Sequence, residues 1–177
     1  VLVNPHQPGC LYPFKELSGA GLALKLGLAF AAACDRAVDP RILLRVACLG
    51  TIADLVPLRD ENRVIASIGL AELARVRSPG LKALIDVSRV EPPFSTADVG
   101  YRLGPRLNAP GRLDSATKSL ELLLCRDPER ARRLAEELDR FNRERQTEER
   151  RVVDEAREDF ESRQPLPSIL VAWSERW

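Results

Sequence analysis

The chain has 177 residues, with 27 basic and 26 acidic side chains and a formal net charge of +1. This near-neutral balance excludes a nucleic-acid binder that works by bulk positive charge, and 45% hydrophobic residues exclude a disordered chain. Because the chain contains no methionine and starts at Val1, we expect it to be a segment from inside a longer protein.

The first part of the chain alternates loops with apolar helical segments. Residues 1–3 predict the end of a buried strand. Ser18 is placed to cap a helix over residues 19–33, and Asp39 with Pro40 is a typical start of a second helix. The second helix is expected to bury Ile42, Leu43, Val46, Ala47 and Leu49.

Further helices are predicted over residues 64–76, 81–87 and 115–124. Before the last of these, Ser95 and Asp98 have the spacing of a capping box, which marks a helix start. Residues 104–112 contain so much Gly and Pro that we expect a rigid loop there and no helix.

The longest predicted element is a helix from Asp127 to about Ser162, with apolar positions at both ends and none over residues 142–151. This pattern favours a solvated bridge between two packed bodies. The alternative is a surface helix with many i,i+4 ion pairs inside one domain. Residues 169–173 then predict a new strand.

The four cysteines, Cys10, Cys34, Cys48 and Cys125, are far apart in the sequence and form no C-x-x-C pair. This spacing excludes a zinc ribbon, and the low density excludes a disulfide scaffold. We therefore expect reduced thiols in or near a core, as in a cytoplasmic protein. The most apolar stretch, residues 22–34, is too short to span a membrane, so no membrane association is expected.

Asp54 is the sharpest single candidate for chemistry, because it is the one acid in an apolar run over residues 50–58. Burying a bare carboxylate is costly, so it must be exposed at the end of an element, paired, or bound to a cation. In a cleft it could bind Mg²⁺ or Mn²⁺. The alternative is a capping or salt-bridged aspartate.

Arg106, Asn108 and Arg112 form a second candidate site. Two guanidinium groups on a rigid loop make a fork for phosphate or carboxylate. The alternative is that these arginines cap helix ends or pair with Asp98 and Asp114.

Ser18, Gly19 and Gly21 place small residues at a helix N-terminus, where backbone N–H groups attract anions. The alternative role is close packing between helices. His6, the single histidine, lies in a polar loop and is expected to be exposed, and no catalytic triad can be assembled around it. Aromatic residues make up 5% of the chain, so no base-stacking platform is evident.

Several motifs in register resemble one family. They are V-N-P-H-Q-P-G at 3–9, L-S-G-A-G-L-A at 17–23, L-G-T-I-A-D-L-V-P-L at 49–58 followed by E-N-R at 61–63, and G-P-R-L-N-A-P-G-R-L at 104–113. In this order the chain resembles the RecJ single-strand-specific exonucleases of the DHH phosphoesterase superfamily.

The resemblance implies a metal-dependent phosphodiesterase that degrades single-stranded DNA from the 5′ end in DNA repair and recombination. It implies two ions, Mn²⁺ or Mg²⁺, held by several aspartates and a histidine, and in-line attack by a metal-activated water. It further implies partners such as a single-stranded-DNA-binding protein and a helicase.

Carried over by motif, Asp54 matches a catalytic metal ligand of the family. Arg106, Asn108 and Arg112 match the segment R-x-N-x-x-G-R, in which at least one arginine is expected to contact DNA phosphate. Ser18, Gly19 and Gly21 match the S-G-x-G turn, with a structural or site-shaping role.

The chain also departs from the family pattern, because the DHH triplet and the aspartate motifs before it are absent. The catalytic histidine is not carried onto His6. One carboxylate cannot hold two hard cations, so we expect the chain alone to have no nuclease activity and no tight Mn²⁺ site.

The expected fold class is α/β and helix-rich. Residues 1–125 would form the later part of a DHH-type parallel-sheet domain with a helical segment. Residues 126–163 would form the connector helix, and 164–177 the start of a second, DHH-associated domain. Two other functions stay open: a DHH phosphodiesterase acting on short oligonucleotides or cyclic dinucleotides, and a catalytically dead replication scaffold.

Overall fold

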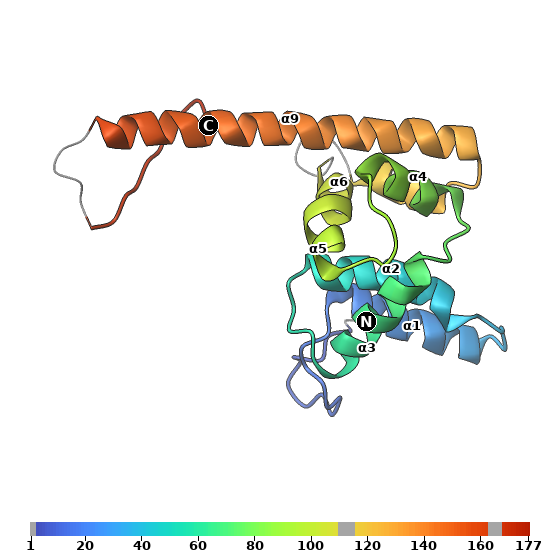
Figure 1. Cartoon of the computed structure of the whole chain (residues 1–177). Coiled ribbons are helices and arrows are strands. Elements are labelled where there is room, and N and C mark those ends of the chain that lie inside the picture. Colours follow the sequence, from blue (N-terminus) through green and yellow to red (C-terminus); the bar gives the residue numbers. More distant parts are fainter. Residues whose placement is uncertain (1–2, 110–115, 163–167) are drawn as a thin grey trace.

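The computed structural model describes residues 3–109, 116–162 and 168–177, and every regular element in these ranges is helical (Figure 1). The helices are α1 (Gly19–Ala33), α2 (Pro40–Ala53), α3 (Asp60–Leu73), α4 (Pro79–Ser88), α5 (Thr96–Asp98), the π-helix η1 (Val99–Leu103), α6 (Gly104–Asn108), α8 (Thr117–Leu124) and α9 (Pro128–Glu161).

The expected strands and the parallel sheet are not found in the described residues. Val3 lies outside any strand, while residues 1–2 fall outside the described ranges. The strand predicted at 169–173 is wrong, because this segment has no ladder partner and is mostly exposed. A strand needs a neighbour to satisfy its backbone groups, and no other extended segment of the described chain supplies one.

Four predicted helix starts are confirmed by their caps, whereas the helix predicted over 64–76 is Asp60–Leu73. Ser18 accepts a hydrogen bond from the backbone N–H of Gly21, and Asp39 accepts one from Arg41. At the start of α9, Asp127 accepts from the N–H of Arg130. Each cap satisfies an N–H group that the first helical turn leaves without a partner. The capping box of Ser95 and Asp98 is also present.

Two predictions about helix patterns are wrong. Residues 104–108 form the helix α6, because Pro105 occupies a first-turn position where its missing N–H costs no helical bond. In α2, Ala47 and Leu49 are buried as expected, but Ile42 and Val46 are 56% and 43% exposed. Helical spacing identifies the apolar stripe of a helix, whereas the neighbouring elements decide how much of it is covered.

The helices form a body with three tiers (Figure 1). Helices α1, α2 and α3 pack together at one end, and α9 lies across the other end. Between them, α4, η1, α6 and α8 connect the two tiers through one continuous hydrophobic core. Close packing depends on glycine at two points. A methyl group on Gly69 would lie 2.3 Å from Cβ of Cys48, and one on Gly80 would lie 1.8 Å from the carbonyl oxygen of Leu122.

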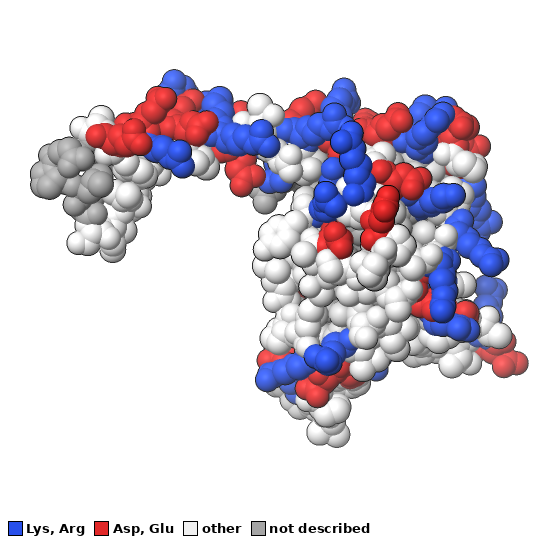
Figure 2. All heavy atoms as spheres, viewed as in Figure 1, with Lys and Arg blue, Asp and Glu red and all other residues white. Residues whose placement is uncertain are grey.

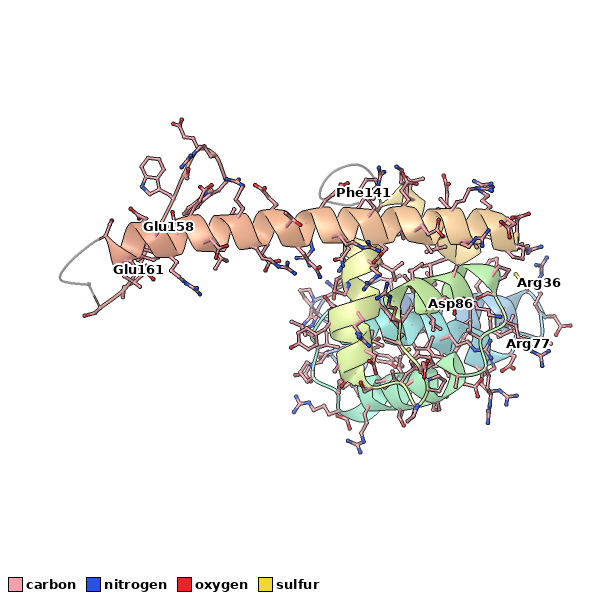
Figure 3. The ribbon with its side chains drawn as sticks, turned by 45° about the horizontal axis from the view of Figure 1, so that its top comes forward. Arg36, Arg77, Asp86, Phe141, Glu158 and Glu161 are labelled. Carbon is pink, nitrogen blue, oxygen red and sulfur yellow. The ribbon has the colours of Figure 1, made fainter. Side chains whose placement is uncertain are left out.

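Helix α9 has two unlike halves. Its buried residues all lie in the first half, where it packs against α4, α6 and α8. Its second half projects beyond the body. In Figure 3, Phe141 lies over the body, whereas Glu158 and Glu161 lie at the far end of the helix. The predicted apolar contacts are therefore confirmed at the first end, and the bridge to a second packed body stays a prediction.

The thiols lie at different depths. Cys48 is fully buried and Cys34 is exposed, while Cys10 and Cys125 are intermediate, so the expectation of thiols in or near the core fails for Cys34. Within the described residues, no helix has both the length and the apolar composition that a membrane span requires.

Candidate functional site

Asp54 is the residue that ends α2. It follows the last helical residue, Ala53, and its own N–H bonds the carbonyl of Gly50. The side chain is exposed, and its carboxylate has no hydrogen-bond or ion-pair partner among the described residues. A helix C-terminus carries partial negative charge, so the carboxylate and the helix end both attract cations here. The salt-bridged alternative therefore has no support in the described chain, whereas Asp54 does stand at the C-cap of α2 through its backbone.

The loop after Asp54 is held in an unusual backbone conformation. Leu55 has φ of 56°, in the left-handed region that non-glycine residues rarely adopt, and its side chain is 87% exposed. Such a residue costs about 1–3 kcal/mol and persists only where the surroundings fix it. In this protein, side chains of the α3 start hold the loop in this conformation.

Asn62, at the start of α3, is the residue that fixes the loop. Its buried side-chain amide donates to the carbonyl of Pro57 at 3.1 Å and to that of Glu16 at 2.7 Å. Arg59 adds a two-bond ion pair to the carboxylate of Glu16, which lowers the pKa of that acid through the hydrogen bond from Arg59. The loop after Asp54 is thereby tied to the segment that precedes Ser18.

Asn62 was not among the residues singled out from the sequence as site residues. The signal that could have found it is its place in the E-N-R motif directly after the apolar run, because a buried asparagine needs several partners and usually bonds loop backbone.

The S-G-x-G turn packs directly against the helix that carries Asp54. The hydroxyl groups of Ser18 and Thr51 lie 2.9 Å apart and both are buried. A methyl group on Gly21 would lie 3.0 Å from Cδ2 of Leu17, whereas one on Gly19 would meet nothing within 4 Å. Because the cap of Ser18 is directed at its own helix and buried, the geometry supports close packing at Ser18 and Gly21, with Gly19 at an open position.

The two main motifs meet at the end of α2. A methyl group on Gly104 would lie 3.3 Å from Cβ of Ala53 and 3.0 Å from the carbonyl oxygen of Val99. Only a glycine allows this approach without displacement of the neighbouring atoms. Asp54 follows Ala53 directly, and Arg106 is two residues after Gly104, so the aspartate motif and the arginine segment are in contact at the end of α2.

Arg106 is engaged within the protein. Its Nε and one terminal nitrogen contact Oδ1 of Asp139 on α9, each at 2.8 Å, and its other terminal nitrogen donates to the carbonyl of Arg102 at 2.6 Å. The side chain is 16% exposed and that of Asp139 is 6% exposed. The pairing with an acid that sequence left open is thus found, but with Asp139. Asp98 instead serves its capping box.

The other two members of the arginine segment differ in what the structure shows. Asn108 is exposed at the end of α6. Arg112, together with Asp114, lies outside the described residues.

At the candidate site, the described residues supply one carboxylate, that of Asp54, and no complete metal site. Within it, no group of three or more His, Cys, Asp or Glu side chains is placed to hold an ion. His6 is exposed, and its backbone N–H donates to Oδ1 of Asn4 at 2.9 Å. The residues present therefore fit one oxygen ligand of a hard cation, which needs several.

Comparison with known proteins places the chain clearly. No protein-family model matches it. It is 44% identical over 177 residues to the single-stranded-DNA-specific exonuclease RecJ of Bacillus subtilis (strain 168), a match that covers 99% of this chain and 22% of that protein. It is 37% identical over 192 residues to the RecJ exonuclease of Escherichia coli (strain K12), with 99% of this chain and 33% of that protein covered.

Solved structures give the same result. The crystal structure of RecJ in complex with Mg²⁺ from Thermus thermophilus matches 85% of this chain and 24% of its own chain, with a TM-score of 0.76 and 34% identity. That of an exonuclease RecJ bound to manganese matches 84% of this chain and 38% of its own, with a TM-score of 0.75 and 34% identity. The chain spans about a quarter to a third of the proteins it matches. In sequence and in helical fold, it belongs to the RecJ family and corresponds to one segment of its members.

Proposed function

We propose that this chain is a segment of a Mn²⁺- or Mg²⁺-dependent exonuclease that degrades single-stranded DNA from the 5′ end in DNA repair and recombination. The observation that carries the proposal is the contact of Ala53 with Gly104, which sets an exposed, unpaired Asp54 beside the arginine segment. Support comes from relatives named as single-stranded-DNA-specific exonucleases and from neighbours that hold Mg²⁺ and manganese.

In this proposal Asp54 supplies one carboxylate ligand to a divalent ion. Bound ions of this kind lower the pKa of water and stabilise charge on phosphate oxygens. Asp54 needs no rearrangement to bind a cation, because its carboxylate is exposed and Asn62 holds the loop that follows it. The remaining ligands would come from parts of the relatives that this chain does not span.

The arginine segment would bind the DNA backbone. A guanidinium has five N–H donors, and three of those on Arg106 are used by Asp139 and Arg102. Two remain for a phosphate, on a side chain that the ion pair holds in place. Asn108 and Arg112 complete the proposed contacts. Ser18 and Gly21 shape the packing of α1 against α2, with Gly19 at an open position beside them.

The proposed architecture follows the division into residues 1–125, 126–163 and 164–177. The first part belongs to the catalytic domain, and α9 is the connector. The last part begins a second, DHH-associated domain. The same proposal includes a cytoplasmic location and partners of the DNA-replication machinery, namely a single-stranded-DNA-binding protein and a helicase.

The test uses the full-length protein that contains this segment. We expect Asp54→Ala to abolish degradation of a 5′-labelled single strand while binding of that strand in the absence of divalent ions stays within about twofold. Arg106→Ala should mainly weaken binding. Asp86→Ala on α4 is the matched control, because Asp86 is also an exposed aspartate and lies on another element of the body (Figure 3).

Two outcomes would contradict this assignment. Wild-type rates for both the Asp54 and the Arg106 variants would show that the site lies elsewhere. Strand degradation by the purified 177-residue chain would show that one aspartate of this segment does not depend on ligands from the rest of the protein.

A further inference from the structure

A small apolar pocket lies on the surface directly after Asp54. Its volume is about 300 Å³, and it is formed where the end of α2 and its following loop face the α5–η1 segment. One wall comes from Ile52, Leu55 and Val56, and the opposite wall includes Ala97 and Tyr101. In the view of Figure 2, the left edge of the body below α9 shows a broad stretch without charged atoms.

Two of the lining residues are highly exposed. Tyr101 is 82% exposed and Leu55 is 87% exposed. Large apolar groups at this exposure are costly in water, and Leu55 is held there by the strained backbone described above. Leu55 is also the immediate neighbour of Asp54, so the pocket continues the proposed site.

The chemistry of the lining selects the kind of ligand. None of the lining residues is charged, so the pocket offers a phosphate group only the hydroxyl groups of Thr96 and Tyr101 and no charge to neutralise it. An exposed aromatic ring beside aliphatic side chains instead suits a flat, weakly polar ring, which gains from stacking and from removal of apolar surface from water. The volume lies at the lower end of ligand pockets, about 300–1,000 Å³, which fits one ring system.

We propose that this pocket receives one nucleobase of the single-stranded substrate, stacked on Tyr101 and packed against Leu55. The inference rests on the proposed function and extends it. Asp54 would act at the phosphate through its ion, and the pocket would fix the base of an adjoining nucleotide. Stacking is independent of sequence because every base has a flat face, so the pocket would hold a strand without selecting its sequence.

The experiment measures KM and kcat of the full-length protein on single strands that carry one abasic residue, moved one position at a time from the 5′ end. The variants are Tyr101→Ala and Tyr101→Phe. Leu124→Ala on α8 is a control, because Leu124 is also an exposed apolar residue at 69% exposure and is not among the lining residues. Since Tyr101 is exposed, we expect all three variants to unfold at the wild-type temperature.

For the wild type, an abasic residue at one position should raise KM by about 5- to 150-fold, the factor that corresponds to loss of one stacked base. Tyr101→Ala should raise KM on intact DNA by a similar factor and should show no further loss with the abasic residue at that position. Tyr101→Phe and Leu124→Ala should behave as the wild type.

Two results would overturn the inference while leaving the proposed function in place. One is a wild type that degrades single strands while Tyr101→Ala has unchanged KM. The other is a KM loss in Tyr101→Ala that adds fully to the abasic loss at every position. A wild type that degrades no single-stranded DNA overturns the proposed function and the base pocket together.

Discussion

The two halves of α9 belong to one unbroken helix but are stabilised in different ways. The first half buries Ala131, Ala135 and Leu138 against the body. The second half has no buried residue. Its side chains instead form ion pairs three or four residues apart along the helix, such as Arg145 with Glu149 at 2.7 Å. Residues 168–177 add contacts along it, including a bond of 2.9 Å from Nε1 of Trp177 to Glu155.

This difference shows that helix formation and helix anchoring are separate problems. Charged residues with good helix propensity and i,i+4 pairs suffice to continue a helix into solvent. The position of a helix relative to the rest of the protein, in contrast, requires apolar burial. Among the described residues, those of α9 that are buried lie where it packs against α4, α6 and α8.

The largest expected change in the free energy of unfolding comes from the loss of apolar burial. Leu138→Ala, at a fully buried site of the first half, should lower the free energy of unfolding by about 2–5 kcal/mol, because it removes burial and leaves a cavity. Val153→Ala in the second half, where the side chain is 50% exposed, should change it by less than about 0.5 kcal/mol. Urea unfolding of the 177-residue chain measures both, and equal losses would refute the distinction between the halves.

The next effect concerns the buried ion pair between α6 and α9. Asp139→Ala should lower the unfolding free energy by up to about 3 kcal/mol, because it leaves the guanidinium of Arg106 largely buried without its partner. Glu149→Ala, which breaks an exposed pair of the second half, should cost about 0.3–0.5 kcal/mol. A double variant Arg106→Met with Asp139→Leu that regains most of the loss would locate the cost in the unpaired charge.

The next effect is the pH dependence of the stability of the body. The pKa of Glu72 is held below its usual value of 4.5, first of all by the hydrogen bond from Arg45, with Arg75 adding a second. A lowered pKa means that this contribution is present above pH 4.5 and is lost as the pH falls through the folded-state pKa. Glu72→Gln should therefore make unfolding of the body less sensitive to acid below pH 4.5, measured by thermal melts. An unchanged acid dependence would contradict a role for this acid.

The smallest effect is that of salt on the projecting half. Exposed i,i+4 pairs contribute about 0.3–0.5 kcal/mol each and are screened at high ionic strength. Hydrogen exchange of backbone amides over residues 145–160 should therefore speed up severalfold between low and about 1 M salt, while amides of α2 and α3 should change little. Uniform changes across both regions would indicate that the halves are held by the same forces.

Local signals carried the sequence-based prediction of the helices. Ser18, Asp39, Ser95 and Asp127 each began a helix as expected, since a cap needs only its own first turn. The errors arose where the outcome depends on distant parts of the chain. Helix α6 is stabilised by packing on α2 and α9, and the segment at 169–173 has no strand to pair with in the described chain.

For the candidate site, the sequence singled out candidate residues but could not give their contacts. The cost of burying a bare carboxylate limited Asp54 to an exposed element end, an ion pair or a bound cation, and the structure shows an exposed element end. The pairing of Arg106 with Asp139 joins residues 33 positions apart, and the bonds of Asn62 reach to Glu16. Spacing along the chain cannot give such partners, because the fold decides which helices cross.

The contact of Arg106 with Asp139 has a mechanical consequence. It joins the segment beside Asp54 to a helix that extends about 30 Å further, at about 1.5 Å per residue over roughly its last 20 residues. The projecting half of α9 is therefore a rigid arm that begins near this ion pair. A tilt of about 5° at the ion pair displaces the far tip by about 2–3 Å on an arm of this length. A force on the tip is in turn transmitted to α6, which packs against the end of α2.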